Sequence, residues 1–357
     1  MSLKIGIVGL PNVGKSTLFN ALTKAGALAA NYPFATIEPN TGIVEVPDDR
    51  LKALAELYNS KKIIPATINF VDIAGLVEGA SKGEGLGNKF LSHIRECDAI
   101  AQVVRDFKND DILHVADRIH PAQDIEIIKT ELILADLATL EKRIQNFKKE
   151  VKSNPKLKPL DDLYHLVLES LQSGEIPDLD EEQKADLKDL NLFSTKPTMY
   201  IFNVSEEDLQ NDENKQKLQA LVPNNPALFV NAKLEEELSE LDEESSSELL
   251  AEYGQTESGL QKVISSAYKL LGLQSYLTAG PEEVRAWTIK TGATAPQAAG
   301  VIHGDFERGF IAAQVINYQD LIEAGSESAV KAAGKIHTEG RNYIMQPDDV
   351  VEFRFNV

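Results

Sequence analysis

The chain has 357 residues, of which 43% are hydrophobic and 26% charged, and its formal net charge at pH 7 is −20. This length exceeds the limit of about 250 to 300 residues for a single core, so two or three domains are expected. The negative charge argues against capture of nucleic acid by the whole surface, and the single cysteine, Cys97, excludes an intramolecular disulfide or a thiolate metal cluster. No apolar run reaches the roughly 18 residues of a membrane span. We therefore expect a cytoplasmic protein that binds neither membrane nor DNA.

The first predicted element is a strand at residues 3–8, which leads into Gly9-Leu10-Pro11-Asn12-Val13-Gly14-Lys15-Ser16 and then into a helix-compatible stretch. Glycines let the backbone turn so that successive N–H groups point at an anion, and the helix adds the positive end of its dipole. The order strand, loop and helix predicts a phosphate-binding loop. Lys15 is expected to reach the β- and γ-phosphates, and the Ser16 hydroxyl to bind Mg²⁺.

Further strands are predicted at residues 68–73 and 99–104, in a pattern of alternating strands and helices that is typical of a parallel sheet covered on both faces. Asp72 and Gly75 follow the strand at 68–73, where an acid is expected to hold Mg²⁺ and an amide to sense the γ-phosphate. Thr36 lies in the polar loop between these motifs. It is expected either to bind Mg²⁺ through a second hydroxyl or to lie at the edge of a strand.

Leu76 occupies the position where many related GTPases place a glutamine that orients the attacking water. Leucine has no polar atom for this task, so hydrolysis is expected to be slow and to need another group. His114 is one candidate, although a surface or capping role fits it equally well. Asn12 is another, because its oxygen can hold a monovalent cation such as K⁺; the simpler role is a hydrogen bond that braces the loop.

The base-recognition motif departs from that of a GTPase. After a predicted strand at 198–202, Asn203-Val204-Ser205-Glu206 stands where a guanine reader shows N-K-x-D. The longer Glu206 side chain should weaken a bidentate contact to guanine that is worth about 1 to 3 kcal/mol, while Asn203 can still bond N6 and N7 of adenine. Asn231-Ala232-Lys233, after a strand at 227–230, is expected to complete the base site, and Phe107 or Val204 to pack on the ring. These residues favour ATP, with GTP weaker or comparable.

A helical segment is predicted to interrupt the sheet. Its apolar residues alternate at spacings of three and four, which is typical of two helices packed as an antiparallel coiled coil. The first helix, of some 28 residues, would extend about 40 Å; an ordinary helical subdomain is the alternative. Residues 141–158 carry seven basic and two acidic residues, a stretch that suits RNA phosphate or a solvated helix face, whereas residues 235–252 carry nine acids and no base. The two apolar series are Ile133, Leu137, Leu140, Ile144, Phe147 and Val151, then Leu157, Leu160, Tyr164, Val167 and Leu171.

From about residue 274 onward, short strands at 287–290, 310–315 and 350–355 and a helix at 318–323 predict a small α+β module. The whole chain is thus divided into an NTPase domain at 1–125, a helical insertion at 126–195, the rest of the NTPase domain at 196–275, and a C-terminal module at 276–357.

These motifs together resemble the YchF-type Obg-like ATPases, a family of P-loop NTPases. The resemblance rests on the phosphate loop, on residues 31–37, on Asp72-Ile73-Ala74-Gly75-Leu76-Val77-Glu78-Gly79-Ala80-Ser81, on Asn203 to Glu206, and on the helical insertion. Residues 303–310 and 353–357 resemble a TGS domain, which has a ubiquitin-like β-grasp fold. One departure is Gln346-Pro347-Asp348-Asp349, where an Asp-Gly-Asp turn is usual.

The resemblance implies an α/β P-loop NTPase with an inserted coiled coil and a C-terminal TGS domain. It also implies an Mg²⁺-dependent ATPase that binds GTP as well and associates with the ribosome, either the large subunit or the assembled particle, and with rRNA. A monomer is the default. A ribosome-assembly GTPase and a nucleotide-stabilised scaffold that recruits RNA remain alternatives. The expected catalytic residues are Lys15, Thr36, Gly75 and His114; the expected metal ligands are Ser16, Thr36 and Asp72; and nucleotide contacts are expected from Asn12, Val13, Gly14, Lys15, Ser16, Thr17, Phe107, Asn203, Val204, Glu206, Asn231, Ala232 and Lys233.

Overall fold

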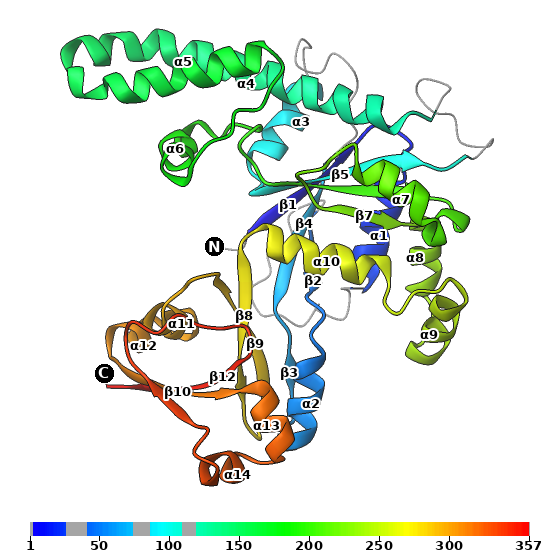
Figure 1. The fold of residues 1–357 in the computed structure, drawn as a ribbon, viewed down its shortest axis with the longest axis vertical. Coiled ribbons are helices and arrows are strands. Elements are labelled where there is room, and N and C mark those ends of the chain that lie inside the picture. Colours follow the sequence, from blue (N-terminus) through cyan, green and yellow to red (C-terminus); the bar gives the residue numbers. More distant parts are fainter. Residues whose placement is uncertain (1–2, 26–40, 74–85, 109–118, 357) are drawn as a thin grey trace. The chain divides into compact units, whose positions relative to one another are not determined.

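The structure is a computed structural model that describes residues 3–25, 41–73, 86–108 and 119–356 (Figure 1). The chain forms two compact units. The first contains residues 1–42 and 69–263, and the second contains residues 43–68 and 264–357. Within the described ranges, no helix is both long enough and apolar enough to span a membrane.

The first unit is built on a sheet with the strand order β2-β4-β1-β5-β6-β7. β1 pairs in parallel with β4 and β5, and β6 pairs in parallel with β5 and β7. Parallel strands covered on both faces are nearly continuous apolar runs, and seven of the eight residues of β5 are buried. The sequence missed β2, which is short and half exposed. The strands are β1 (Lys4–Gly9), β2 (Thr41–Glu45), β4 (Thr67–Asp72), β5 (Ala99–Asp106), β6 (Thr198–Val204) and β7 (Ala227–Val230).

Helices cover both faces of this sheet (Figure 1). Five neighbouring strands of the sheet, β4, β1, β5, β6 and β7, run parallel, so the loops that follow them all leave from one edge. Open α/β sheets bind ligands at this edge. The helices are α1 (Lys15–Ala25), α3 (Leu86–Arg95), α7 (Asp212–Gln219), α8 (Ala232–Leu238), α9 (Glu243–Glu252) and α10 (Gly259–Leu270), with a 3₁₀ turn at Glu207–Gln210; the second unit begins within α10.

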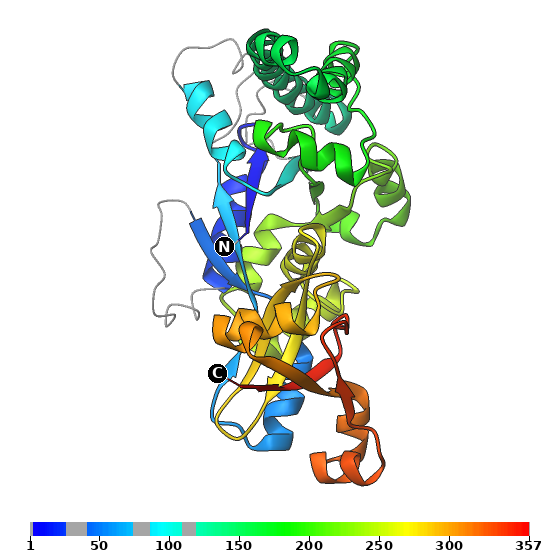
Figure 2. The same ribbon diagram turned by 90° about the vertical axis from the view of Figure 1, so that its left-hand side faces the viewer.

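Two further helices, α4 (Pro121–Ser153) and α5 (Lys158–Gln172), lie side by side (Figures 1 and 2). The two apolar series expected from the sequence meet in one core, which also takes in Leu163 and residues near the following helix, α6 (Glu181–Leu187). The 33 residues of α4 correspond to about 50 Å, which exceeds the expected length. The reason is an earlier start, because the His120 ring accepts a hydrogen bond from the Gln123 amide and caps the helix ahead of Pro121.

The second unit has its own sheet, with the order β11-β10-β12-β8-β9-β3, and its own apolar core. The sequence predicted β9, β10, β12 and α13 but missed the rest, and it assigned residues 43–68 to the NTPase domain. Those residues include α2 and β3, and β3 pairs in parallel with β9, while the range also takes in the end of β2 and the start of β4. The elements are α2 (Asp49–Tyr58), β3 (Ile63–Ile64), β8 (Leu273–Ala279), β9 (Val284–Lys290), α11 (Ala295–Ile302), α12 (Gly304–Arg308), β10 (Phe310–Asn317), α13 (Tyr318–Ala324), α14 (Glu327–Ala332), β11 (His337–Glu339) and β12 (Asp349–Phe355).

The unusual segment before β12 forms a closed turn. The amide of Asp349 donates to the carbonyl of Gln346 at 3.2 Å, and the Gln346 amide donates to the Asp349 carboxylate at 2.7 Å. The Tyr343 hydroxyl donates to the same carboxylate, which is buried. Burial raises the pKa of Asp349. The hydrogen bonds from Gln346 and Tyr343 lower it, but burial has the larger effect. The turn is thus held by a buried carboxylate in place of a glycine.

Candidate nucleotide site

The loop between β1 and α1 has the backbone conformation that an anion-binding turn requires. Asn12 and Gly14 both have positive φ angles, 64° and 92°. Alternation between left- and right-handed conformations directs neighbouring N–H groups into one concavity, and asparagine and glycine adopt positive φ most readily. The Leu18 amide donates to the Gly14 carbonyl at 3.0 Å, so α1 starts directly from the loop.

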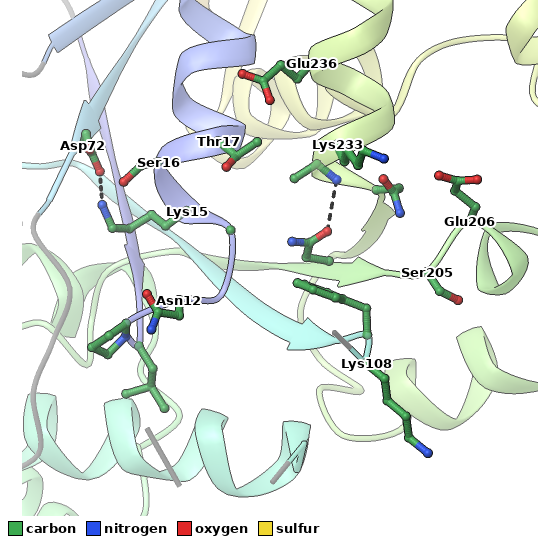
Figure 3. Close-up of a pocket in the computed structure, with 17 residues that line it drawn as sticks. Asn12, Lys15, Ser16, Thr17, Asp72, Lys108, Ser205, Glu206, Lys233 and Glu236 are labelled. Atoms are coloured by element: carbon green, nitrogen blue, oxygen red, sulfur yellow. Dashed lines mark hydrogen bonds and ion pairs between the residues drawn. The ribbon is translucent and has the colours of Figure 1, made fainter. Parts of the chain in front are cut away.

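This loop borders a cavity of about 1100 Å³ at the carboxyl edge of the first sheet (Figure 3). The cavity brings together residues from the ends of five strands, as the parallel topology predicts. Val13 and Val204 do not line it, because both side chains are buried in the core. The lining residues are Leu10, Pro11, Asn12, Gly14, Lys15, Ser16, Thr17, Asp72, Phe107, Lys108, Asn203, Ser205, Glu206, Asn231, Ala232, Lys233 and Glu236.

Lys15 and Asp72 form an ion pair at the inner end of the cavity (Figure 3). Lys15 is buried and the Asp72 side chain is about one fifth exposed. The Ser16 hydroxyl lines the same cavity, so hydroxyl and carboxylate oxygens lie beside the loop, and these are the donors that Mg²⁺ prefers. The described residues contain no cluster of three or more histidine, cysteine or acidic side chains that would hold a metal without help from a phosphate.

Asn203 links the phosphate loop to the loop after β7. Its side-chain amide donates to the Val13 carbonyl at 2.9 Å, and its side-chain oxygen accepts from the Ala232 amide at 3.0 Å. The side chain is buried, and a Cβ atom at Gly14 would lie 2.2 Å from its nitrogen. The bidentate adenine contact expected from the sequence competes with these two bonds, whereas the bridging role had no signal in the sequence.

The loop after β7 is fixed by Asn231. Its side-chain oxygen accepts from the Leu234 amide and caps α8, while its nitrogen donates to the Val204 carbonyl at 2.8 Å. Glu206 is exposed and accepts from the Tyr253 hydroxyl at 2.9 Å, a bond that raises the pKa of Tyr253. Asn231 therefore orients the wall that Ala232 and Lys233 present to the cavity.

The Arg105 guanidinium packs against the Phe107 ring. The guanidinium carbon of Arg105 lies 4.4 Å from the centre of the Phe107 ring, and its Nε donates to the Phe107 carbonyl at 3.1 Å. Arg105 is buried, and its pKa is lowered by burial, with the Asp124 carboxylate acting in the opposite direction. A buried arginine at the end of an apolar strand is the signal that would have found it.

Five lining residues were not among the expected contacts: Leu10 and Pro11 of the phosphate loop, and Lys108, Ser205 and Glu236. Ser205 lies inside the motif at 203–206, and its hydroxyl donates to Asp208 at 2.7 Å. Glu236 lies three residues after Lys233 on α8, which is the helical spacing that returns to one face. Thr36, Gly75 and His114 lie outside the described residues.

Two family models match separate parts of the chain. A family model described as 50S ribosome-binding GTPase matches residues 4–131, and a model of the C-terminal part of YchF GTPases, described as a protein of unknown function, matches residues 273–356. The chain is 54% identical to "Ribosome-binding ATPase YchF" of Haemophilus ducreyi and 51% identical to the Bacillus subtilis protein of that name, covering all of each protein in both cases.

The chain belongs to the YchF family. A solved member, the YchF GTPase of Schizosaccharomyces pombe, has a TM-score of 0.87 and 38% identity, with 99% of this chain and 98% of that chain covered. A GTP-binding protein of Pyrococcus horikoshii, at 21% identity and a TM-score of 0.62, shares the fold, covering 99% of this chain and all of that one. The first unit therefore has the P-loop GTPase fold, a mixed sheet flanked by helices.

Proposed function

We propose that this protein is a cytoplasmic, ribosome-associated ATPase that hydrolyses ATP slowly and uses the nucleotide as a switch for ribosome binding. The observation that carries the proposal is the positive-φ phosphate loop, with Lys15, Ser16 and Asp72 gathered on one cavity. Full-length relatives named ribosome-binding ATPases supply the reaction and the partner. Slow turnover follows from Leu76, which has no polar atom to orient water.

Mg²⁺ fits this donor set, and we assign Ser16, Asp72 and Thr36 to it. When bound, the ion neutralises charge that develops on the phosphates. Lys15, which pairs with Asp72 in the structure, is assigned to the β- and γ-phosphates. We assign the γ-phosphate contact to the Gly75 amide and the positioning of water to His114, while Asn12 is a candidate ligand for K⁺.

We assign the base to the opposite end of the cavity. Phe107 offers a ring face for stacking, and Glu206, Ala232 and Lys233 form the surrounding wall. Asn203 acts there chiefly as the brace between the loops, because both ends of its amide are already bonded. Glutamate at position 206 places the carboxylate one methylene farther out than the aspartate of a guanine reader, and this favours adenine.

We also propose that residues 126–195 act as a coiled-coil arm and residues 276–357 as a TGS domain of β-grasp fold. The α4–α5 pair supports the arm, and its far end carries exposed lysines that suit rRNA phosphate. The second sheet and its apolar core, which includes Ala295, Ala298 and Ala299 of α11, support the TGS domain. The protein is taken as a monomer.

Calorimetric titration with Mg²⁺-ATP and Mg²⁺-GTP at one fixed potassium concentration tests the proposal. ATP binding that is tighter by about tenfold, or 1.4 kcal/mol, supports the ATPase. A GTP preference of that size would favour a GTPase, as the Schizosaccharomyces pombe relative is named. A Lys15→Ala variant could lose ATP binding and still bind ribosomes equally well with and without nucleotide. This result would favour the alternative of a scaffold that recruits RNA.

A further inference from the structure

The second unit contains a cavity of about 520 Å³ at a place where two strands of its sheet separate. β12 pairs with β10 along its whole length, and β8 does the same with β9. Between β8 and β12, both of which are fully described, the ladder holds the single pair Val350 and Leu277. Past this pair no further ladder pair joins these two described strands, and residues 278–280 and 351–353 are among those that line the cavity.

Strand edges that face a gap present backbone N–H and C=O groups. Such edges pair with an added strand, and this is how several domains recognise extended peptides. A strand entering between β8 and β12 would meet an edge on each side, where an ordinary sheet edge offers one. The cavity therefore has the backbone chemistry of a site for an extended peptide.

The side chains of the cavity define the charge of its ligand. Phe306, Ile302 and Ile316 supply apolar surface, and Glu327 and Glu352 supply two exposed carboxylates. No lysine or arginine is among the lining residues of this fully described region. Apolar surface beside carboxylates suits a lysine or arginine side chain, whose aliphatic stem packs while its charged end stays near water and the acids. Burial and then the neighbouring Glu327 carboxylate raise the pKa of Tyr58, which also lines the cavity.

We propose that this cavity binds an extended basic segment of a partner protein, which adds as a strand between β8 and β12 and directs a lysine or arginine side chain to Glu327 and Glu352. The inference does not depend on the proposed ATPase, because all its residues belong to the second unit. It adds a protein partner to a chain whose proposed partners are nucleotide and ribosome.

A short peptide of alternating lysine and valine, titrated into the full-length protein, tests the charge requirement. Trp287 is the only tryptophan, and its Nε1 donates to Thr278 of the cavity wall at 2.9 Å, so its fluorescence reports on the site. We expect saturable binding that weakens about tenfold in the double variant Glu327→Gln, Glu352→Gln. Glu323→Gln, an exposed glutamate of α13 that does not line the cavity, should leave the affinity unchanged.

The backbone requirement is tested with the same peptide N-methylated at alternate residues, which keeps the charges but removes backbone donors. We expect it to lose binding, as measured by calorimetry in parallel with fluorescence. Equal binding of the methylated peptide would overturn strand addition. Equal binding of a glutamate–valine peptide, an unchanged affinity in the double variant, absence of any binding, or binding of a short oligouridine instead would overturn the basic-peptide ligand.

Discussion

At the scale of single residues, Asn203 bridges the phosphate loop and the loop after β7. Replacing it with alanine leaves the Val13 carbonyl and the Ala232 amide without their partner in a buried position. Each such loss costs about 1 to 3 kcal/mol. Because the bridge holds both loops, we expect Asn203→Ala to weaken ATP and GTP binding by similar factors and to lower the melting temperature. Calorimetry with both nucleotides measures this. A loss confined to ATP would assign Asn203 to adenine recognition instead.

Glu235, on α8, is a buried carboxylate outside the cavity. One oxygen accepts from the Gly259 amide at 2.6 Å, and the other is buried with no hydrogen-bond partner. Burial raises the pKa of Glu235 above its ordinary value of 4.5, while the hydrogen bond from the Gly259 amide acts against the shift. The folded state therefore holds this proton at a higher pH than the unfolded state does. Its stability falls as pH rises from about 4.5 through the folded pKa.

Glu235→Gln removes this titration and keeps an oxygen that accepts from Gly259. We expect the free energy of unfolding of the variant, minus that of the parent, to become more positive as pH rises through this window and then to level off. Urea unfolding at a series of pH values gives the difference. A difference that moved in the opposite direction would mean that the hydrogen bonds at the start of α10 outweigh burial.

At the scale of elements, the start of α10 packs closely against the junction of β7 and α8. A Cβ atom at Gly259 would lie 2.7 Å from Val230 and from Glu235, and Val230 directly precedes Asn231. We expect Gly259→Ala to lower stability by about 1 to 3 kcal/mol through overpacking and to weaken nucleotide binding by displacing Asn231. Gly304 also begins a helix, but a Cβ there meets nothing within 4 Å, so Gly304→Ala is the matched control. Equal melting temperatures for the two variants would contradict this packing argument.

The elements predicted from the sequence are those with strong local patterns. The buried strands β1 and β5 are short apolar runs, and α4 and α5 have regular apolar spacing, so both kinds were found. β2 was missed because its only adjacent apolar residues, Ile43 and Val44, form too short a run to indicate a strand. The placement of residues 43–68 in the second unit depends on the pairing of β3 with β9, a contact between segments more than 200 residues apart. No local pattern encodes such a contact.

In the candidate nucleotide site too, residues of a local motif were predicted and residues placed by tertiary contacts were not. The phosphate loop is contiguous and its glycine spacing is dictated by backbone geometry, so the sequence was sufficient to predict Lys15 and Ser16 on the cavity. Whether Glu236 lines the cavity depends on which face of α8 meets it. The bridge from Asn203 to Val13 joins residues 190 positions apart. These contacts arise from tertiary packing and needed the structure.

At the scale of the whole molecule, the net charge of −20 requires that contact with RNA be local. Exposed lysines gather where α4 ends and α5 begins, at positions 148, 149, 152 and 156. If these lysines meet rRNA phosphate, each one removed should reduce the slope of log K against log salt by about 0.7 to 0.9. We therefore expect the fourfold lysine-to-glutamine variant to bind ribosomes more weakly and with a much smaller dependence on salt.

Cosedimentation with ribosomes over a series of potassium chloride concentrations measures both quantities. The matched control is a double variant in which glutamine replaces Lys188 and Lys217, which are exposed elsewhere in the first unit. It is compared with a double variant of the cluster, in which glutamine replaces Lys148 and Lys152. ATP affinity should stay constant in every variant, because none of these lysines lines the nucleotide cavity. A control pair that lowered the salt slope as much as the cluster pair would show that binding follows net charge. The helical arm would then have no particular part in it.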